Sequence, residues 1–218
     1  MKKIITTISL LLVGMTCSFA QDENDTREEF EMGAKAGVNI SNVYDEEGDN
    51  FVANSKAGFA GGIFFSIPLN KYIGIQPEVM FCQKGFQSTR TIALSPFFNN
   101  YTVNYTTTTN HIDIPLQLQI KPSPFLTLVA GPQYSFVLSK EDKRTDSNGN
   151  VNSTQTDYDN SNIRRNIFGV IGGLDININH LVLSGRAGWD LQNNNGDGTS
   201  TNPRYKNAWY QLTAGIKF

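Results

Sequence analysis

Eight segments of this chain alternate apolar and polar residues with a period of two, and this feature limits the fold most. In residues 111–136, HIDIPLQLQIKPSPFLTLVAGPQYSF, Ile112, Ile114 and Leu116 alternate with Asp113 and Gln117. Such alternation predicts β-strands with one apolar and one polar face, and no helical periodicity of useful length competes with it. The expected strands are residues 32–43, 56–67, 72–87, 106–121, 125–139, 164–178, 181–192 and 206–218.

The connections between these strands differ in length in a regular order. The tight ones are 68–71, 122–124 and the turn around Asn179 and His180, and the long ones are 44–55, 88–105, 140–163 and 193–205. Long and short connections alternate strictly, so in an up-and-down sheet all long loops leave from one end. Outer-membrane barrels have short periplasmic turns and longer extracellular loops. A soluble sandwich has no reason to sort its loops in this way.

The two faces of the expected strands differ in charge and in side-chain size. The apolar face carries no charged residue. The other face holds Lys35, Asn39, Gln76, Glu78, Asp113, Gln117, Gln119, Gln133, Asp175, Arg186, Asp190, Gln211 and Lys217, together with many glycines. Small residues let an eight-stranded barrel close, because its interior is only wide enough for side chains to fill. We therefore predict that the apolar face contacts lipid and that the polar face fills the barrel.

The fold class that follows is all-β. We expect an eight-stranded antiparallel up-and-down transmembrane β-barrel over residues 32–218, with four long extracellular loops and three short periplasmic turns. The outer membrane is the expected location, and outer-membrane lipid is the expected partner of the apolar face. An eight-stranded barrel of this kind leaves no open pore.

The first residues have the layout of a secretory signal peptide. Lys2 and Lys3 precede the apolar stretch 4–13, and small residues precede Gln21, so we expect residues 1–20 to be removed. Cys17 raises a lipoprotein alternative, which Gly14 disfavours. Residues 21–31 are expected to be an acidic, disordered leader.

Without the signal peptide, Lys+Arg falls from 18 to 16 against 20 Asp+Glu, a net charge of −4, which argues against nucleic acid as a partner. Only Cys82 then remains, so no internal disulfide can form.

The chain finishes on AWYQLTAGIKF, residues 208–218, which alternates cleanly and ends on Phe218. This segment resembles the C-terminal strand signal that the outer-membrane barrel assembly machinery recognises. We expect Tyr72, Trp189, Tyr210 and Phe218 to lie near the membrane interfaces, where such barrels carry aromatic girdles.

Four segments resemble a known family. They are IGIQPEVMFCQKGF (73–86), HIDIPLQLQIKP (111–122), LVAGPQYSFVLS (128–139) and LTAGIKF (212–218). They are similar to the PorT-type outer-membrane β-barrel family of Bacteroidota, and the resemblance covers nearly the whole mature chain. It implies an eight-stranded outer-membrane barrel but no single activity. The namesake is linked to protein secretion, so an extracellular or secretion-related protein partner is an expectation. No catalytic residue carries over.

Three prolines lie inside expected strands, where each removes a hydrogen-bond donor from the ladder. Pro77, Pro115 and Pro132 lie at comparable heights on three consecutive strands. We expect each to fall at a bulge or at an unpaired N–H position. The alternative is that each proline is tolerated at a non-bonded position without any further consequence.

We assign no catalytic, cofactor-binding or metal-binding residue and expect no cofactor. His111 and Asp113 should point inward near the loop-side rim, as part of a satisfied interior polar cluster. The segment 193–202 is rich in oxygen donors but lacks calcium-loop spacing. The polar loop 140–163 is expected to be mobile, and the aromatic loop 88–105, with Phe97, Phe98, Tyr101 and Tyr105, could contact a partner or extend the strands above the membrane.

The sequence favours a non-enzymatic outer-membrane barrel with a structural or surface-interaction role. One alternative is a lipid-modifying enzyme on the same scaffold, which would need a clustered His, Ser and acid near one rim. The other is a soluble lipocalin-like carrier, which would need an apolar interior.

Overall fold

The computed structural model describes residues 25–47, 53–92, 101–146, 151–156, 164–194 and 204–218. These residues form a short 3-10 helix and nine strands. The elements are η1 (Thr26–Glu28), β1 (Glu31–Glu47), β2 (Ala53–Pro68), β3 (Ile73–Ile92), β4 (Tyr101–Ser123), β5 (Leu126–Asp146), β6 (Val151–Thr156), β7 (Asn166–Ile178), β8 (Leu181–Asp190) and β9 (Arg204–Lys217). The predicted signal peptide lies outside the described residues. No helix among the described residues is long and apolar enough to cross a membrane.

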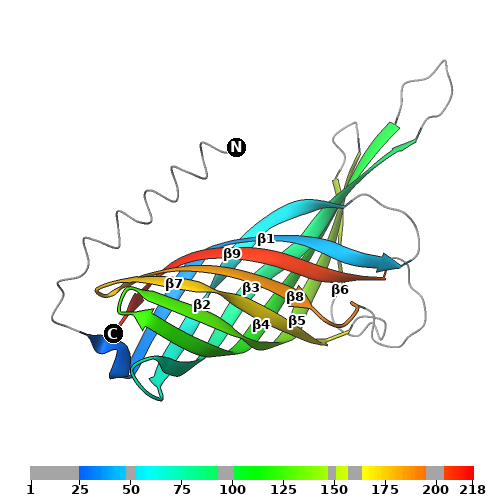
Figure 1. Cartoon of the computed structure of the whole chain (residues 1–218). Coiled ribbons are helices and arrows are strands. Elements are labelled where there is room, and N and C mark those ends of the chain that lie inside the picture. Colours follow the sequence, from blue (N-terminus) through cyan, green and yellow to red (C-terminus); the bar gives the residue numbers. More distant parts are fainter. Residues whose placement is uncertain (1–24, 48–52, 93–100, 147–150, 157–163, 195–203) are drawn as a thin grey trace, which may run out of the picture.

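Eight of the strands close into an antiparallel ring (Figure 1). The sheet order is β4-β3-β2-β1-β9-β8-β7-β5-β6, and the additional pairing of β4 with β5 completes the circle. The first and last barrel strands meet along an extended register, for example Ala36 opposite Ala214 and Asn39 opposite Gln211. The predicted eight-stranded barrel and its three short turns are confirmed. Asn179, in the β7–β8 turn, has φ 52°, a left-handed conformation that asparagine tolerates better than most residues.

The polar face is inside and the apolar face is outside, as the alternation predicts. Lys35, Asp113 and Arg186 are at most 4 % exposed, whereas Leu116, Leu118 and Leu212 are all more than half exposed. The four aromatic residues expected in the girdles are also exposed. The interior holds charged side chains and the exterior holds alkyl side chains. This arrangement is the reverse of the one that a lipocalin-like carrier needs, with an apolar interior.

Glycines on the inner face leave room for two of the interior aromatic rings. A Cβ added at Gly188 would lie 2.3 Å from the Trp209 ring, and one added at Gly33 would lie 2.6 Å from the Phe64 ring. Trp209 and Phe64 are both buried. The expectation that small residues allow the barrel to close is therefore confirmed at these two positions.

Each in-strand proline lies at a gap in one ladder. The β2–β3 pairing is interrupted opposite Pro77, the β3–β4 pairing opposite Pro115 and the β4–β5 pairing opposite Pro132. The register is the same on both sides of each gap, so none of the prolines marks a bulge. Each missing N–H faces the preceding strand, while the pairing to the following strand continues. The prolines therefore lie at unpaired N–H positions, and the bulge alternative is wrong.

Two expectations about loops and the leader need correction. Residues 140–163 were expected to be a polar loop, but β5 continues to Asp146 and β6 pairs with it, Lys140 opposite Thr156 and Thr145 opposite Val151. This hairpin needs no apolar alternation because its backbone N–H and C=O groups pair with one another along the ladder. Residues 25–31 were expected to belong to a disordered leader, but they form η1 and the start of β1. Residues 21–24 lie outside the described part of the chain.

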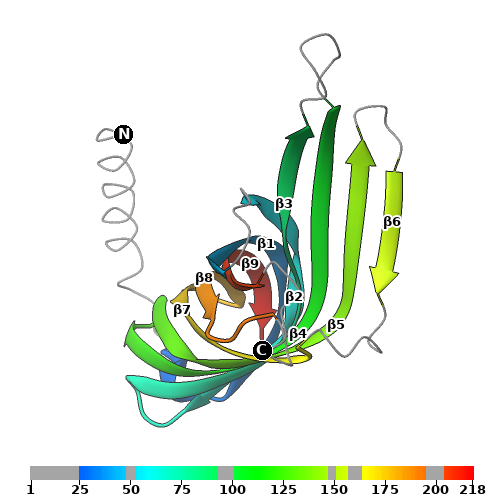
Figure 2. The same ribbon diagram turned by 90° about the vertical axis from the view of Figure 1, so that its right-hand side faces the viewer.

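The upper parts of β3, β4 and β5 rise beyond the barrel wall together with β6 (Figure 2). We call residues 89–92, 101–109, 140–146 and 151–156 the extracellular sheet. The described parts of the 88–105 region extend the strands, as one of the two expectations stated, because Ser88–Ile92 pair with Tyr105–Tyr101. Phe97 and Phe98 lie outside the described residues.

Candidate functional site: the barrel interior and its two ends

Two clusters of charged and polar residues lie in the lumen at different heights. The periplasmic-side cluster consists of Lys35, Gln76, Glu78, Asp175 and Arg186. The extracellular-side cluster consists of Lys84, Asp113, Asp190, Asn207 and Trp209. Every member of both clusters is at most 4 % exposed. Isolated charges are costly to bury, so the contacts within each cluster decide whether this interior is stable.

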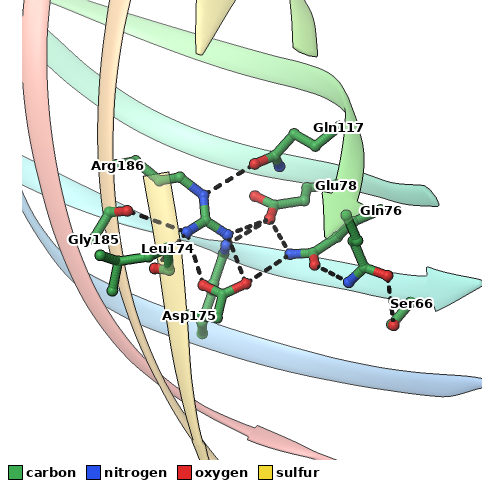
Figure 3. A network of polar contacts seen from close by, with 10 residues as sticks. Ser66, Gln76, Glu78, Gln117, Leu174, Asp175, Gly185 and Arg186 are labelled. Carbon is green, nitrogen blue, oxygen red and sulfur yellow. Dashed lines mark hydrogen bonds and ion pairs between the residues drawn. The ribbon is translucent and has the colours of Figure 1, made fainter. Parts of the chain in front are cut away.

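Arg186 is the centre of the periplasmic-side cluster (Figure 3). Its Nη1 lies 2.7 Å from Asp175 Oδ1, and its Nη2 lies 3.4 Å from Glu78 Oε1. The guanidinium also donates to Gln117 Oε1 at 3.0 Å and to the Leu174 carbonyl at 2.9 Å. Arginine suits such a position because its planar fork of donors can serve several acceptors at once.

Glu78 joins Arg186 to the opposite wall of the barrel. Its Oε1 lies 2.7 Å from Lys35 Nζ and accepts from Gln76 Nε2 at 2.7 Å. The polar chain continues through Gln119 to Ser66, whose hydroxyl donates to Gln119 at 3.0 Å. Two cations and two carboxylates therefore balance at this height, and their hydrogen bonds tie strands β1, β3, β7 and β8 together.

Lys84 is the centre of the extracellular-side cluster. Its Nζ lies 3.1 Å from Asp113 Oδ2, 3.9 Å from Asp190 Oδ1 and 3.6 Å from the centroid of the Trp209 ring. Asn207 donates to Asp190 at 2.7 Å. A cation over a desolvated indole face is favourable, so Trp209 contributes to holding Lys84. Lys84 and Trp209 were not predicted from the sequence to be functional residues, although both have the parity of the inner face.

His111 and Asp113 point inward, as expected, and each has a different partner. His111 Nε2 lies 2.9 Å from Thr109 Oγ1, and Asp113 is held by Lys84. Both side chains are at most 2 % exposed, so bound substrate would not reach them. In the described residues, no group of three His, Cys, Asp or Glu side chains could hold a metal ion.

The lumen is capped at the extracellular end by apolar side chains. Val43, Phe86 and Tyr205 form a buried cluster above Lys84, and the Phe86 and Tyr205 rings meet edge to face at 5.1 Å. Together with the two charge clusters, this cap occupies successive heights of the described interior. The site can therefore hold the barrel closed.

The periplasmic end is covered by the turn at η1. Arg27 Nη1 donates to the Lys121 carbonyl at 3.3 Å, and Lys121 Nζ donates to the Arg27 carbonyl at 3.1 Å. Thr26 donates to Glu31, which also accepts from Lys217 at 2.8 Å. A small cavity of about 20 Å³ lies behind the turn, enough for one water molecule.

The Asp25 carboxylate controls this turn. Its hydrogen bond with Arg27, with Lys71 as a second partner, holds the pKa of Asp25 well below its ordinary value. A lowered folded pKa means that the ion pair stabilises the turn above the ordinary Asp pKa and is lost only as pH falls through the lowered value. We expect Asp25→Asn to reduce the hydrogen-exchange protection of the Glu29 amide, which donates to the Thr26 carbonyl at 3.0 Å. Glu28→Gln, at an exposed position of the same turn, is the control that should leave it unchanged.

Cys82 is a probe of the sealed interior. It is 1 % exposed and packs against Ala60 and Met80. We expect a maleimide to label Cys82 of the folded chain prepared without residues 1–20 more than about a hundredfold more slowly than Asn104→Cys on the exposed sheet, because labelling needs local opening. Equal rates at the two positions would show that the lumen is open to solvent.

A closed eight-stranded ring with a lipid-facing apolar wall and a charged, filled interior is the architecture of outer-membrane β-barrel proteins. The chain belongs to the outer membrane protein beta-barrel domain family, whose model matches residues 19–195. No curated protein has significant sequence similarity to it.

Several solved structures of outer-membrane barrels are similar to this chain. Ail of Yersinia pestis, in complex with the heparin analogue sucrose octasulfate, is 15 % identical, with 87 % of this chain and 99 % of Ail covered and a TM-score of 0.47. The Neisserial surface protein A (NspA) is 12 % identical, with 87 % and 97 % covered and a TM-score of 0.38. The outer membrane protease OmpT from Escherichia coli is 12 % identical, with 88 % and 97 % covered and a TM-score of 0.45.

Proposed function

We propose that this protein is a closed, non-enzymatic outer-membrane barrel whose extracellular sheet serves as a surface for interaction with other proteins. The main support for this proposal is the extracellular sheet itself. In it, β3, β4 and β5 continue beyond the barrel wall, and β6 is added as a further strand. A barrel needed only as a membrane span would have no use for strands of this length. His111, the histidine that a lipid-modifying enzyme on this scaffold would need, is sealed inside the barrel.

The extracellular sheet has the composition of a water-facing surface. β5 carries Lys140, Glu141, Asp142, Lys143 and Arg144 in succession. On its inner face, Arg144 lies over the Tyr105 ring at 5.9 Å and Thr107 donates to Asp142 at 2.7 Å. Among the described large hydrophobic side chains of this sheet, only Tyr105 is exposed. The sheet is therefore ordered by polar contacts of its own and does not depend on lipid.

Site-specific photo-cross-linking in intact cells tests this proposal. A photoreactive phenylalanine analogue at Asn104 or Lys143, both exposed on the sheet, should give protein adducts. The same group at lipid-facing Leu116 is the control and should give none, because its neighbours are acyl chains. Adducts that were equally absent at all three positions would contradict an interaction role. The same purified barrel should show no stepwise conductance in planar bilayers, because its lumen is filled.

Two finer assignments accompany the proposal. The four motif-bearing segments, residues 73–86, 111–122, 128–139 and 212–218, support membership of the PorT-type branch of Bacteroidota, and a secretion-related partner would then be among the cross-linked proteins. The clean alternation of β9 and its terminal Phe218 support recognition by the barrel assembly machinery. Replacing Phe218 with serine should slow assembly of the barrel in cells without changing the stability of the assembled form.

A further inference from the structure

We infer that the free edge of β6 pairs with the β6 strand of a second copy of this chain anchored in an opposing membrane. This inference rests on the proposed function and names its partner. Within the described residues, β6 is the last strand of the sheet and pairs with β5 alone. Its other edge therefore presents a row of backbone donors and acceptors, which is the surface used when a strand is added to a sheet.

The sequence of β6 lacks the features that normally protect such an edge. Natural edge strands carry charges, especially lysine, or proline or a bulge. β6 reads VNSTQT and contains none of these, and it pairs with β5 without a change of register. Its neighbour β5 carries six charged residues in the seven positions 140–146. The charges are thus concentrated on β5, which is already paired at both edges, and are missing from β6, which is paired at one edge.

The absence of charge also favours an identical strand as the partner. A twofold-symmetric antiparallel pair places the central residues of the strand, such as Ser153 of β6, beside the same residues of the other copy, and like charges there destabilise the pair. A symmetric pair of β5 strands centred on Lys143 would bring two lysines together. A symmetric pair of β6 strands would not, so self-pairing is free of electrostatic cost.

The orientation of β6 relative to the membrane determines whether the second copy lies in the same membrane or in an opposing one. β5 runs away from the barrel and β6 runs back toward it (Figure 2). Two barrels in one membrane are related by an axis along the membrane normal, which keeps both β6 strands pointing toward that membrane. An antiparallel pair needs the two strands to point in opposite directions. Copies in two facing membranes meet this condition, so the predicted contact joins two membrane surfaces.

A single six-residue pairing is small compared with a stable interface. Many copies on two facing membranes would act together, and such multivalency raises the overall strength of adhesion without any new contact. The protein would thus promote homotypic contact between cells or between vesicles that carry it.

Vesicle clustering tests the inference with variants that place a positive or a negative charge at the same position of β6. Proteoliposomes carrying the mature chain should cluster with each other and leave protein-free vesicles unbound. Ser153→Lys vesicles and Ser153→Glu vesicles should each cluster about tenfold less with their own kind, because the symmetric pairing repeats the like-charge contact. Mixing the two kinds should restore clustering. Thr145→Lys, on β5, is the control and should cluster like the unmodified chain.

Heat-dependent gel mobility confirms that every variant contains a folded barrel. Binding to protein-free vesicles, or clustering that ignores the charge at position 153, would overturn the inference. If those results came with protein adducts at Asn104 and Lys143 in cells, the proposed surface-interaction function would stand. Only the inference that β6 pairs with a second copy of the chain would then be rejected. If the cross-linking also failed, the proposed function itself would fall.

Discussion

Replacing Arg186 with alanine is expected to lower the free energy of unfolding of the barrel by about 3–5 kcal/mol, the usual cost of removing one partner from a buried ion pair. Arg186 contacts Asp175 at 2.7 Å and Glu78 at 3.4 Å in the middle of the lumen. Without it, Lys35 alone would face two buried carboxylates. Denaturant unfolding of the chain refolded in lipid vesicles measures the change.

Two further variants separate charge from packing in this experiment. Arg144→Ala removes an arginine that lies on the extracellular sheet and is exposed, so it should change the unfolding free energy by less than about 1 kcal/mol. Adding Asp175→Asn to Arg186→Ala removes one of the two uncompensated charges and should recover part of the loss. If Arg186→Ala and Arg144→Ala were equally stable, the periplasmic-side cluster would not stabilise the barrel.

Adding one methyl group at Gly37 is expected to prevent the barrel from closing normally. A Cβ at this position would lie 2.0 Å from the Leu212 carbonyl oxygen and 2.7 Å from the Thr213 Cα. Both are backbone atoms of β9, so no side chain can rotate away, and β1 would have to separate from β9 at the seam that closes the ring. We expect Gly37→Ala to cost more than the roughly 1–3 kcal/mol typical of overpacking.

Gly172→Ala is the matched control for Gly37→Ala. A Cβ there would meet its nearest atom, the Val129 carbonyl oxygen, at an ordinary 3.6 Å. The folded fraction of each variant can be read from the difference in gel mobility between heated and unheated samples. Gly172→Ala should fold like the unmodified chain, while Gly37→Ala should remain largely in the unfolded band. Equal folded fractions would mean that the seam between β1 and β9 is looser than its register indicates.

Much of the barrel follows from local pattern. The inward direction of Lys35, Asp113 and Arg186 could be predicted because successive strand residues point to opposite faces, whatever the strand pairs with. The loop-side position of His111 followed from its distance along the strand from the turn at 122–124. The heights of the three prolines along their strands could be counted in the same way. Whether each proline lies at a bulge or at a gap in the hydrogen bonding could be decided only from the strand pairing in the structure.

The cluster contacts could not be predicted in this way. Glu78 and Arg186 are far apart in the sequence, on β3 and β8, and they meet only because the ring closes and its interior is narrow. Lys84 was overlooked because its partners Asp113 and Asp190 lie on β4 and β8. The β6 hairpin was overlooked because VNSTQT has no apolar alternation, and a strand in water needs none.

The sequence by itself determined the strand-rich composition of the chain, the face of each strand that meets lipid and the end of the barrel from which the long connections leave. These are properties of a period of two residues and of chain length between turns, and both are local. Only the tertiary structure decided which charges pair, how the first and last strands are registered and that a fourth strand joins the extracellular sheet. Those outcomes depend on the stagger and tilt of strands around a closed ring, which bring together residues that no local pattern connects.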